Sequence, residues 1–403
     1  MRPNRRSILT GLSASAAAGL LTAPAAQAAE TSTTSTGTSA GGSPWVSRAA
    51  DAWRSLLDHF AHDDGSGLLR EQVPVGEDDP TYSYEWPFSQ AHVAALDLTG
   101  IPGTGRRYRQ DRQELAAAQQ LYWTDASSTG LPGFASAPLP PYAGGGDLFY
   151  DDNLWVGLLD VQQHLMTGDR SALREARRIS DLVDSGWDTD DSHAAPGGVF
   201  WTQAPWSSDR NTVSNMPAAQ LDLRLFQITH DHRYVDRALR YLAWTNRHLR
   251  RGDGLYWDHL NLEGVVDETI WSYNQGVPVG VHVLLHQVTG ERKHLAEACR
   301  IAEASLAWFV DGGRLDAHPP FFNSIWFKNL LLLESVTGGR TYRDAMAAYA
   351  ERMWTTRREQ DSGLFVFPDG ETGGATTMLL QQAAMVQVFA VLAWKRKDHA
   401  LLY

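Results

Sequence analysis

The chain has 403 residues, of which 43% are hydrophobic and 20% charged, and its formal net charge is −12 at pH 7. An acidic surface repels phosphate backbones, and no run of Lys and Arg follows Arg6, so the composition argues against nucleic acid as a partner. The single cysteine, Cys299, excludes an internal disulfide, and the fold must therefore rest on burial of its core.

The first residues predict export. Residues 1–28 join three arginines without an acid to an apolar stretch over 8–21, and an Ala-Gln-Ala cleavage site follows. The pair Arg5-Arg6 favours the twin-arginine route. Because the apolar stretch is shorter than a membrane span, and no later segment reaches that length without charges, we expect a secreted protein with no membrane partner.

A Thr/Ser/Gly tract over 29–43 follows the signal peptide. It has no apolar periodicity and cannot bury enough surface to offset the entropy of ordering, so we expect a disordered spacer. One catalytic domain is predicted over 44–403.

From Pro44 onward one theme recurs: an apolar helix, a Thr-Gly stop, a short charged link and a second helix. The stops fall at 99–100, 167–168, 229–230, 289–290 and 337–338, with His230 in place of glycine at the third. Glycine after a helix adopts the left-handed cap conformation without steric cost. The pattern predicts twelve helices, at 45–60, 86–98, 106–121, 147–166, 171–185, 213–228, 232–250, 274–288, 292–310, 321–336, 341–355 and 376–395.

A recurring hairpin indicates an array in which neighbours bury each other's apolar faces. Six helical hairpins closed into a ring give an all-α fold, the (α/α)6 toroid; an open helical solenoid is the alternative. Long loops rich in Gly, Pro, Asp and Trp precede the inner helices, and they should gather on one face and form the site. These loops are 63–83, 124–146, 187–212, 251–272, 311–320 and 357–374.

Two adjacent acids, Asp151 and Asp152, lie on the apolar stripe of the helix that contains Trp155. Burial of an unpaired charge is costly, so such acids need either a buried ion pair or a cavity with ligand and water. Two like charges about 5 Å apart repel by roughly 3 kcal/mol at an effective dielectric near 20, which is about two pKa units. One acid can then keep its proton while the other stays ionised, as glycoside hydrolysis requires.

Several motifs together resemble glycoside hydrolase family 76, the endo-α-1,6-mannanases. They span about 85 to 390, nearly the whole chain after the spacer. The motifs are Tyr150-Asp151-Asp152-Asn153-Leu154-Trp155-Val156-Gly157-Leu158, Gly197-Gly198-Val199-Phe200-Trp201, Asn211 to Asn215, Trp257-Asp258, Ser272-Tyr273-Asn274-Gln275-Gly276 and Gln381-Gln382-Ala383-Ala384-Met385-Val386. Arg210-Asn211 departs from the Lys-Asn that is common in the family.

The resemblance implies an (α/α)6 fold and retention of anomeric configuration, with Asp151 as nucleophile and Asp152 as acid/base. It also implies that Asp258 holds sugar hydroxyls, and that Tyr273, Asn274 and Gln275 line the same cavity. Loop aromatics can stack on sugar rings. The predicted substrate-binding residues are Trp86, Tyr150, Trp201, Asn215, Asp258, Tyr273, Asn274 and Gln275.

We therefore predict a secreted, monomeric, endo-acting hydrolase of α-1,6-linkages in cell-wall mannan. Alternatives are a hydrolase of another polysaccharide, an exo-mannosidase, and a glycan-binding protein without turnover. No cofactor and no metal are predicted. Residues 188–192 lack the glycine and terminal glutamate of an EF-hand and are interpreted as a solvated acidic loop, and the histidines show no zinc spacing.

Overall fold

The computed structural model describes residues 43–367 and 376–403. The predicted signal peptide and all but the last residue of the predicted spacer lie outside the described residues. Within them, no helix is both long and apolar enough to cross a membrane.

Twelve α-helices occur in the described residues, and each matches one predicted helix. They are α2 (Pro44–Phe60), α3 (Glu85–Thr99), α4 (Arg109–Gln119), α5 (Tyr150–Thr167), α6 (Arg170–Asp184), α7 (Thr212–Thr229), α8 (His232–His248), α9 (Tyr273–Thr289), α10 (Arg292–Leu306), α11 (Pro320–Thr337), α12 (Thr341–Thr356) and α13 (Leu379–Leu392). Single helical turns extend several of them, at Gly105–Tyr108, Gln120–Tyr122, Ala307–Asp311, Leu315–Ala317 and Arg396–Leu401.

The helices form two concentric rings, and the predicted (α/α)6 toroid is confirmed. In the inner ring α3, α5, α7, α9, α11 and α13 pack each against the next, and α13 packs back against α3. These helices are buried on almost every side, whereas the outer helices are amphipathic. In α6, for example, only a stripe containing Ala176, Ile179 and Val183 is buried.

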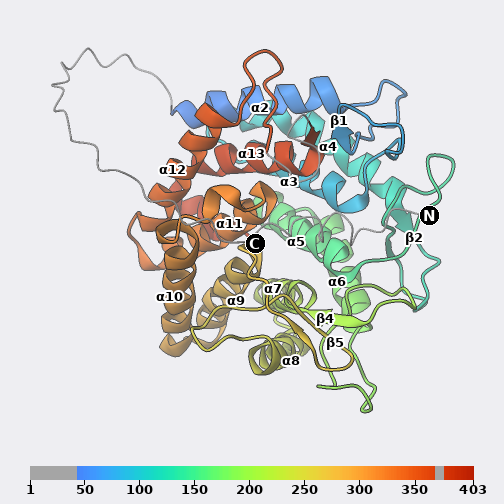
Figure 1. Cartoon of the computed structure of the whole chain (residues 1–403), viewed down its shortest axis with the longest axis vertical. Coiled ribbons are helices and arrows are strands. Elements are labelled where there is room, and N and C mark those ends of the chain that lie inside the picture. The colour runs from blue at the N-terminus through green and yellow to red at the C-terminus, as the bar shows by residue number, and fades with distance from the viewer. Residues whose placement is uncertain (1–42, 368–375) are drawn as a thin grey trace, which may run out of the picture.

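The ring is closed by segments from opposite ends of the chain. Figure 1 shows α2, in blue, beside α13, in red, and the Gln382 amide of α13 donates a hydrogen bond to the Ala52 carbonyl of α2. The short strand β1 (Gln72–Val73) pairs antiparallel with β7 (Thr377–Met378). The sixth hairpin is therefore assembled from helices that are far apart in sequence.

The predicted stops end the inner helices, but not all in the same way. Gly168, Gly290 and His230 adopt the left-handed conformation, His230 with φ of 59°. Gly338 also has positive φ, at 85°. Gly100 does not, because its φ is −79° and the chain continues in a right-handed turn, so the expected left-handed cap is wrong at that position.

The loops that precede the inner helices share one design. Each contains a glycine with positive φ, and these glycines are Gly67, Gly130, Gly197, Gly254, Gly313 and Gly363. One small sheet, β2 (Trp123–Thr124) with β3 (Gly133–Phe134), lies within the loop before α5. Another joins the loops before α7 and α9, and it consists of β4 (Asp209–Asn211), β5 (His259–Asn261) and β6 (Val266–Asp267). Since the inner helices all run in the same direction, these loops gather at one end of the ring, the loop end.

Candidate active site

The acid pair lies at the loop end, in the first turn of α5. Asp151 is 9% exposed and Asp152 is 1% exposed. Phe149 just before them is extended, and the backbone N–H of Tyr150 donates to the carbonyl of Trp201 at 2.9 Å. The helix therefore starts at Tyr150, three residues later than predicted, because a neighbouring loop holds the preceding backbone in an extended form.

The next residue, Asn153, fixes this turn. Its Oδ1 accepts from the backbone N–H of Phe134 at 2.8 Å, and its Nδ2 donates to the carbonyls of Phe134 at 3.0 Å and Phe149 at 2.8 Å. We call this arrangement the amide clamp. It connects the first turn of α5 with strand β3 and so fixes the position of the backbone that carries both carboxylates.

Trp155 shows which way the acid-bearing face points. Its ring is 1% exposed and lies 6.5 Å from the ring of Tyr273 in α9, with the centroid of Tyr403 at 6.4 Å. Helix α9 is two positions around the inner ring from α5, so Trp155 points across the ring. Asp151 and Asp152 precede Trp155 by four and three residues and share its helix face. Both acids therefore face the ring axis.

Aromatic rings from four inner helices meet on that axis. Tyr273 stacks on Phe322 of α11 with centroids 4.0 Å apart and an interplanar angle of 8°. Trp86 of α3 stacks on Phe322 at 6.0 Å and meets Phe321 edge-on at 5.5 Å. The structure thus brings the predicted residues Trp86 and Tyr273 together near the face that carries the acid pair.

A polar cluster at the start of α9 lies beside this aromatic group. Asn274 donates to Asp258 at 3.0 Å, and His259 contacts the other oxygen of Asp258, also at 3.0 Å. Burial opposes the charge of His259, but its hydrogen bond to Asp258 and the charges of Asp258, Asp209 and Asp267 raise its pKa overall. Asp258 and Asn274, both predicted to bind sugar, therefore lie together.

The same cluster contains the atoms of a possible metal site. One ligand atom each from Asp258, His259 and Asp267 lies within 4.8 Å of the others. The raised pKa of His259 favours its protonated form, which supplies the positive charge that the acids require. An ion-pair network accounts for the arrangement.

Two predicted substrate-binding residues make hydrogen bonds to the backbone of neighbouring loops instead. Asn215 accepts from the N–H of Val199 at 3.0 Å, and Gln275 accepts from the N–H of Tyr256 at 2.7 Å and donates to its carbonyl at 3.0 Å. Both side chains are completely buried. They repeat the amide clamp of Asn153 in α7 and α9, and their amide groups are occupied by backbone.

The aromatic residues around the start of α5 also differ in what they do. The Tyr150 ring packs against the end of α6, where a side chain on Gly186 would come within 2.5 Å of it, and burial raises the pKa of Tyr150. Trp201 is 6% exposed and packs edge-on against Phe149 at 5.0 Å. Trp206, which is 45% exposed, is the open ring of this group. Tyr150 and Trp201 thus shape the entry to α5.

A buried ion pair supports the loop that carries Trp201. Arg210 pairs with Asp188, and both side chains are at most 1% exposed. Arg210 also donates to the carbonyls of Ala194 at 2.8 Å and Asn261 at 3.0 Å. The interpretation of 188–192 as a solvated loop is therefore wrong at Asp188, because the sequence did not show that Arg210 would pair with it.

Comparison with known proteins points to one family. The family model described as glycosyl hydrolase family 76 matches residues 45–393. A mannan endo-1,6-alpha-mannosidase of Saccharomyces cerevisiae is 28% identical over 146 residues, which are 34% of this chain and 32% of that protein. The match thus spans about a third of the yeast protein's length.

Solved structures share the fold. A family 76 mannosidase from Bacteroides thetaiotaomicron superposes with a TM-score of 0.75 at 24% identity, over 87% of this chain and 98% of that one. An inactive variant of an α-1,6-mannanase from Salegentibacter, with two consecutive aspartates replaced by asparagine and α-1,6-mannotriose bound, gives a TM-score of 0.69 at 20% identity, over 87% and 99%.

Proposed function

Since the chain belongs to glycosyl hydrolase family 76, we propose that it hydrolyses α-1,6-mannosidic linkages inside cell-wall mannan chains. The observation that carries the proposal is the acid pair Asp151 and Asp152, set in the first turn of an inner helix on the face that points to the ring axis. The positive end of the helix dipole favours an ionised carboxylate there.

In the proposed reaction the configuration at the anomeric carbon is retained. The Asp151 carboxylate attacks the anomeric carbon while the glycosidic C–O bond breaks, and Asp152 gives its proton to the leaving oxygen. Water then attacks the glycosyl-enzyme ester, Asp152 takes a proton from that water, and Asp151 leaves as a carboxylate. Proton and electron pairs balance over the two steps, and no cofactor takes part.

The surroundings of the pair suit a sugar chain. Trp86 and Tyr273 offer ring faces and edges to the C–H surfaces of mannose, and Asp258 with Asn274 offers a carboxylate and an amide to its hydroxyls. We propose these four as substrate-binding residues, whereas Asn215 and Gln275 position the helices that carry them.

The test is product analysis with unbranched α-1,6-mannan. Internal cleavage by the purified protein should release short oligosaccharides of several lengths from the start, whereas mannose alone would indicate exo action. Asp151→Asn and Asp152→Asn should each lower kcat/KM by roughly three orders of magnitude or more. Asp344→Asn is the matched control, because Asp344 is also a first-turn acid but lies exposed on outer helix α12. Full activity in either catalytic variant would overturn the role of that residue.

We also propose that the protein is exported through the twin-arginine route and acts as a secreted monomer. Arg5 and Arg6 support the route. Replacement of both by lysine should retain the protein inside the producing cell, and release that continues unchanged would refute the route without affecting the proposed reaction.

A further inference from the structure

One aromatic ring at the loop end is exposed to solvent. Trp206, in the loop between α6 and α7, is 45% exposed. The other large hydrophobic side chains that are exposed in the described residues are aliphatic, namely Val75, Leu239, Val265 and Val336. A tryptophan ring left in water forgoes the free energy of burial. Trp206 is therefore the exposed aromatic surface that the described part of the chain offers to a ligand.

Trp206 is held in one orientation. Its indole N–H donates to Asp147 Oδ2 at 3.2 Å, and its ring meets Trp201 edge-on, with centroids 6.2 Å apart. The turn that carries it is closed by a hydrogen bond from the N–H of Ser207 to the carbonyl of Ala204, at 2.9 Å. A ring fixed in this way loses little conformational freedom when a ligand stacks on it.

The same turn is bonded to the backbone that leads into α5. Thr202 Oγ1 accepts from the N–H of Ala204 at 3.2 Å and donates to the carbonyl of Leu148 at 2.8 Å. The N–H of Gln203 donates to the same carbonyl at 3.0 Å. The position of Trp206 is therefore coupled to the position of the segment that precedes the acid pair.

The ring also lies close to the acid pair. Its centroid is 6.0 Å from that of Phe149. Phe149 precedes Asp151 by two residues, a span of at most about 7 Å along the backbone. A sugar chain that Asp151 and Asp152 cleave therefore passes within reach of Trp206.

Asp147 adds a polar group beside the ring. This residue is exposed, and one of its carboxylate oxygens already accepts from the indole of Trp206. A carboxylate accepts several hydrogen bonds, so it can also accept from sugar hydroxyls, whereas it repels an anionic ligand. An aromatic face with a hydrogen-bond acceptor at its edge suits a neutral sugar, which has apolar C–H surfaces and hydroxyl groups.

We propose that Trp206 and Asp147 form a further sugar-binding subsite for the mannan chain, beyond the contacts of Trp86 and Tyr273 at the ring axis. The inference rests on the proposed function, because the ligand is the chain that the acid pair cleaves. Contact at this subsite is the same before and during bond cleavage, so it lowers KM and leaves kcat unchanged. It benefits only chains that are long enough to reach from the acid pair to the ring.

Kinetics on α-1,6-linked mannooligosaccharides of increasing length test the subsite. In the wild type kcat/KM should rise with chain length. Trp206→Ala should remove this rise by lowering kcat/KM on the longest chains about fivefold or more, through KM, with little change on the shortest chain that is cleaved. Trp206→Leu keeps apolar packing on Trp201 and Phe149 but has no ring face, so it should show the same loss even if Trp206→Ala folds poorly. Trp206→Phe should retain most of the preference.

Leu239→Ala is the matched control. Leu239 is 43% exposed, close to the value for Trp206, but lies on outer helix α8. Its replacement should leave kcat/KM unchanged at every chain length.

The outcomes separate the subsite from the proposed reaction. If the wild type releases no sugar from any α-1,6-mannan, the proposed function fails and the subsite fails with it. If the wild type cleaves mannan but Trp206→Ala and Trp206→Leu lower kcat/KM equally at every length, lower kcat instead of raising KM, or change nothing, the subsite alone is overturned. Calorimetry with the inactive double variant Asp151→Asn and Asp152→Asn gives an independent readout: addition of Trp206→Leu should weaken binding of long chains and not of short ones, and equal affinity for long chains with and without the ring would also overturn the subsite.

Discussion

Buried acids occupy two regions of the inner ring, and the two regions treat them differently. At the loop end, Asp151 and Asp152 lie in a first helical turn, where the positive end of the helix dipole favours negative charge. In the second half of the inner helices, Asp97, Asp160 and Asp222 have no such help. Asp97 pairs with Lys328 at 2.7 Å, and burial raises the pKa of Asp160 and of Asp222.

The difference shows that position along a helix, as well as burial, decides what an acid can do. All five side chains are at most 9% exposed. In the proposed reaction the first-turn acid Asp151 keeps its charge for the substrate and its neighbour Asp152 supplies the proton, whereas an acid further along the helix needs a cation or a proton from its surroundings. The proposed catalytic pair therefore lies where the inner helix α5 begins.

The largest expected effect comes from removal of the cation in the second region. Lys328→Met leaves Asp97 buried beside the amide of Gln162, which donates to it at 2.8 Å, with no opposite charge. We expect the free energy of unfolding to fall by about 3–5 kcal/mol, measured by urea denaturation at pH 7.

The double variant Lys328→Met with Asp97→Asn should recover most of this loss, because the uncompensated charge is gone. Equal loss in the single and double variants would show that packing around Lys328, and not its charge, is responsible.

A smaller effect is expected at the loop end, where hydrogen bonds and not charges hold the structure. Asn153→Ala removes the amide clamp and leaves two buried backbone groups of Phe134 without that partner, which costs about 1–2 kcal/mol for each. We expect a loss of about 2–4 kcal/mol in unfolding free energy and a lower kcat on mannan, since the first turn of α5 is no longer fixed.

Gln287→Ala is the control for the clamp. Gln287 is also a side-chain amide on an inner helix, but the hydrogen bond that it accepts from Gln227, at 2.8 Å, is exposed. Its replacement should change stability by less than about 0.5 kcal/mol. If Asn153→Ala behaves like Gln287→Ala in both stability and kcat, the clamp does not position the acid pair.

These two regions also mark what the sequence could predict. The twelve helices and the acid pair follow from local signals, namely apolar periodicity, Thr-Gly stops and the spacing from Asp151 to Trp155. The clamps could not be predicted, because Asn215 and Gln275 look like sugar ligands until the loops bring the backbone of Val199 and Tyr256 to them. Such pairings depend on how the loops fold.

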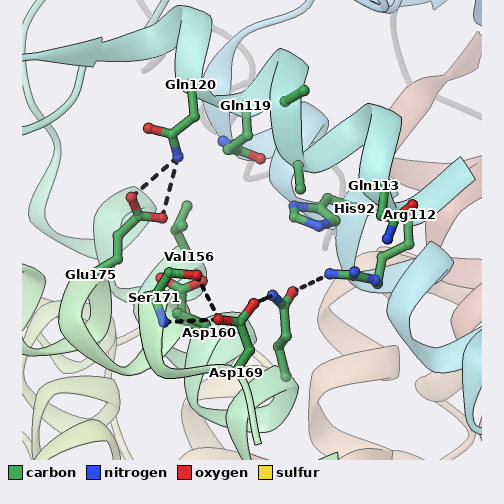
Figure 2. A pocket seen from close by; sticks show the side chains of 14 residues that line it. His92, Arg112, Gln113, Gln119, Gln120, Val156, Asp160, Asp169, Ser171 and Glu175 are labelled. Atoms are coloured by element: carbon green, nitrogen blue, oxygen red, sulfur yellow. Dashed lines mark hydrogen bonds between the residues drawn. The ribbon is translucent and has the colours of Figure 1, made fainter. Parts of the chain in front are cut away.

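Contacts between helices could not be predicted either, because they too depend on how distant segments pack. Asp160 and Glu175 lie on different helices, and most of the chain separates Asp97 from Lys328 in sequence. Neither pair therefore has a signature in local sequence. The pocket between α3, α4, α5 and α6, shown in Figure 2, exists because the α3–α4 and α5–α6 hairpins pack side by side.

The last prediction tests whether a bound proton neutralises Asp222 in the way that Lys328 neutralises Asp97. Burial raises the pKa of Asp222 from 3.8 to about 8, although the Ser180 hydroxyl donates to it at 2.5 Å. Between about pH 4 and 8 the folded protein then holds a proton that the unfolded chain releases, so this group's contribution to stability is fully present below pH 4 and is lost as pH rises towards 8.

Asp222→Asn keeps the hydrogen bond from Ser180 but cannot titrate. The variant should therefore gain stability relative to the wild type by about 1.4 kcal/mol between pH 6 and pH 7, measured by urea denaturation at both values. Asp344→Asn, on the surface, should show no such gain. A stability difference for Asp222→Asn that stays constant from pH 5 to 7 would mean that Asp222 is ionised in the folded protein, and the contrast between the two regions would not extend to α7.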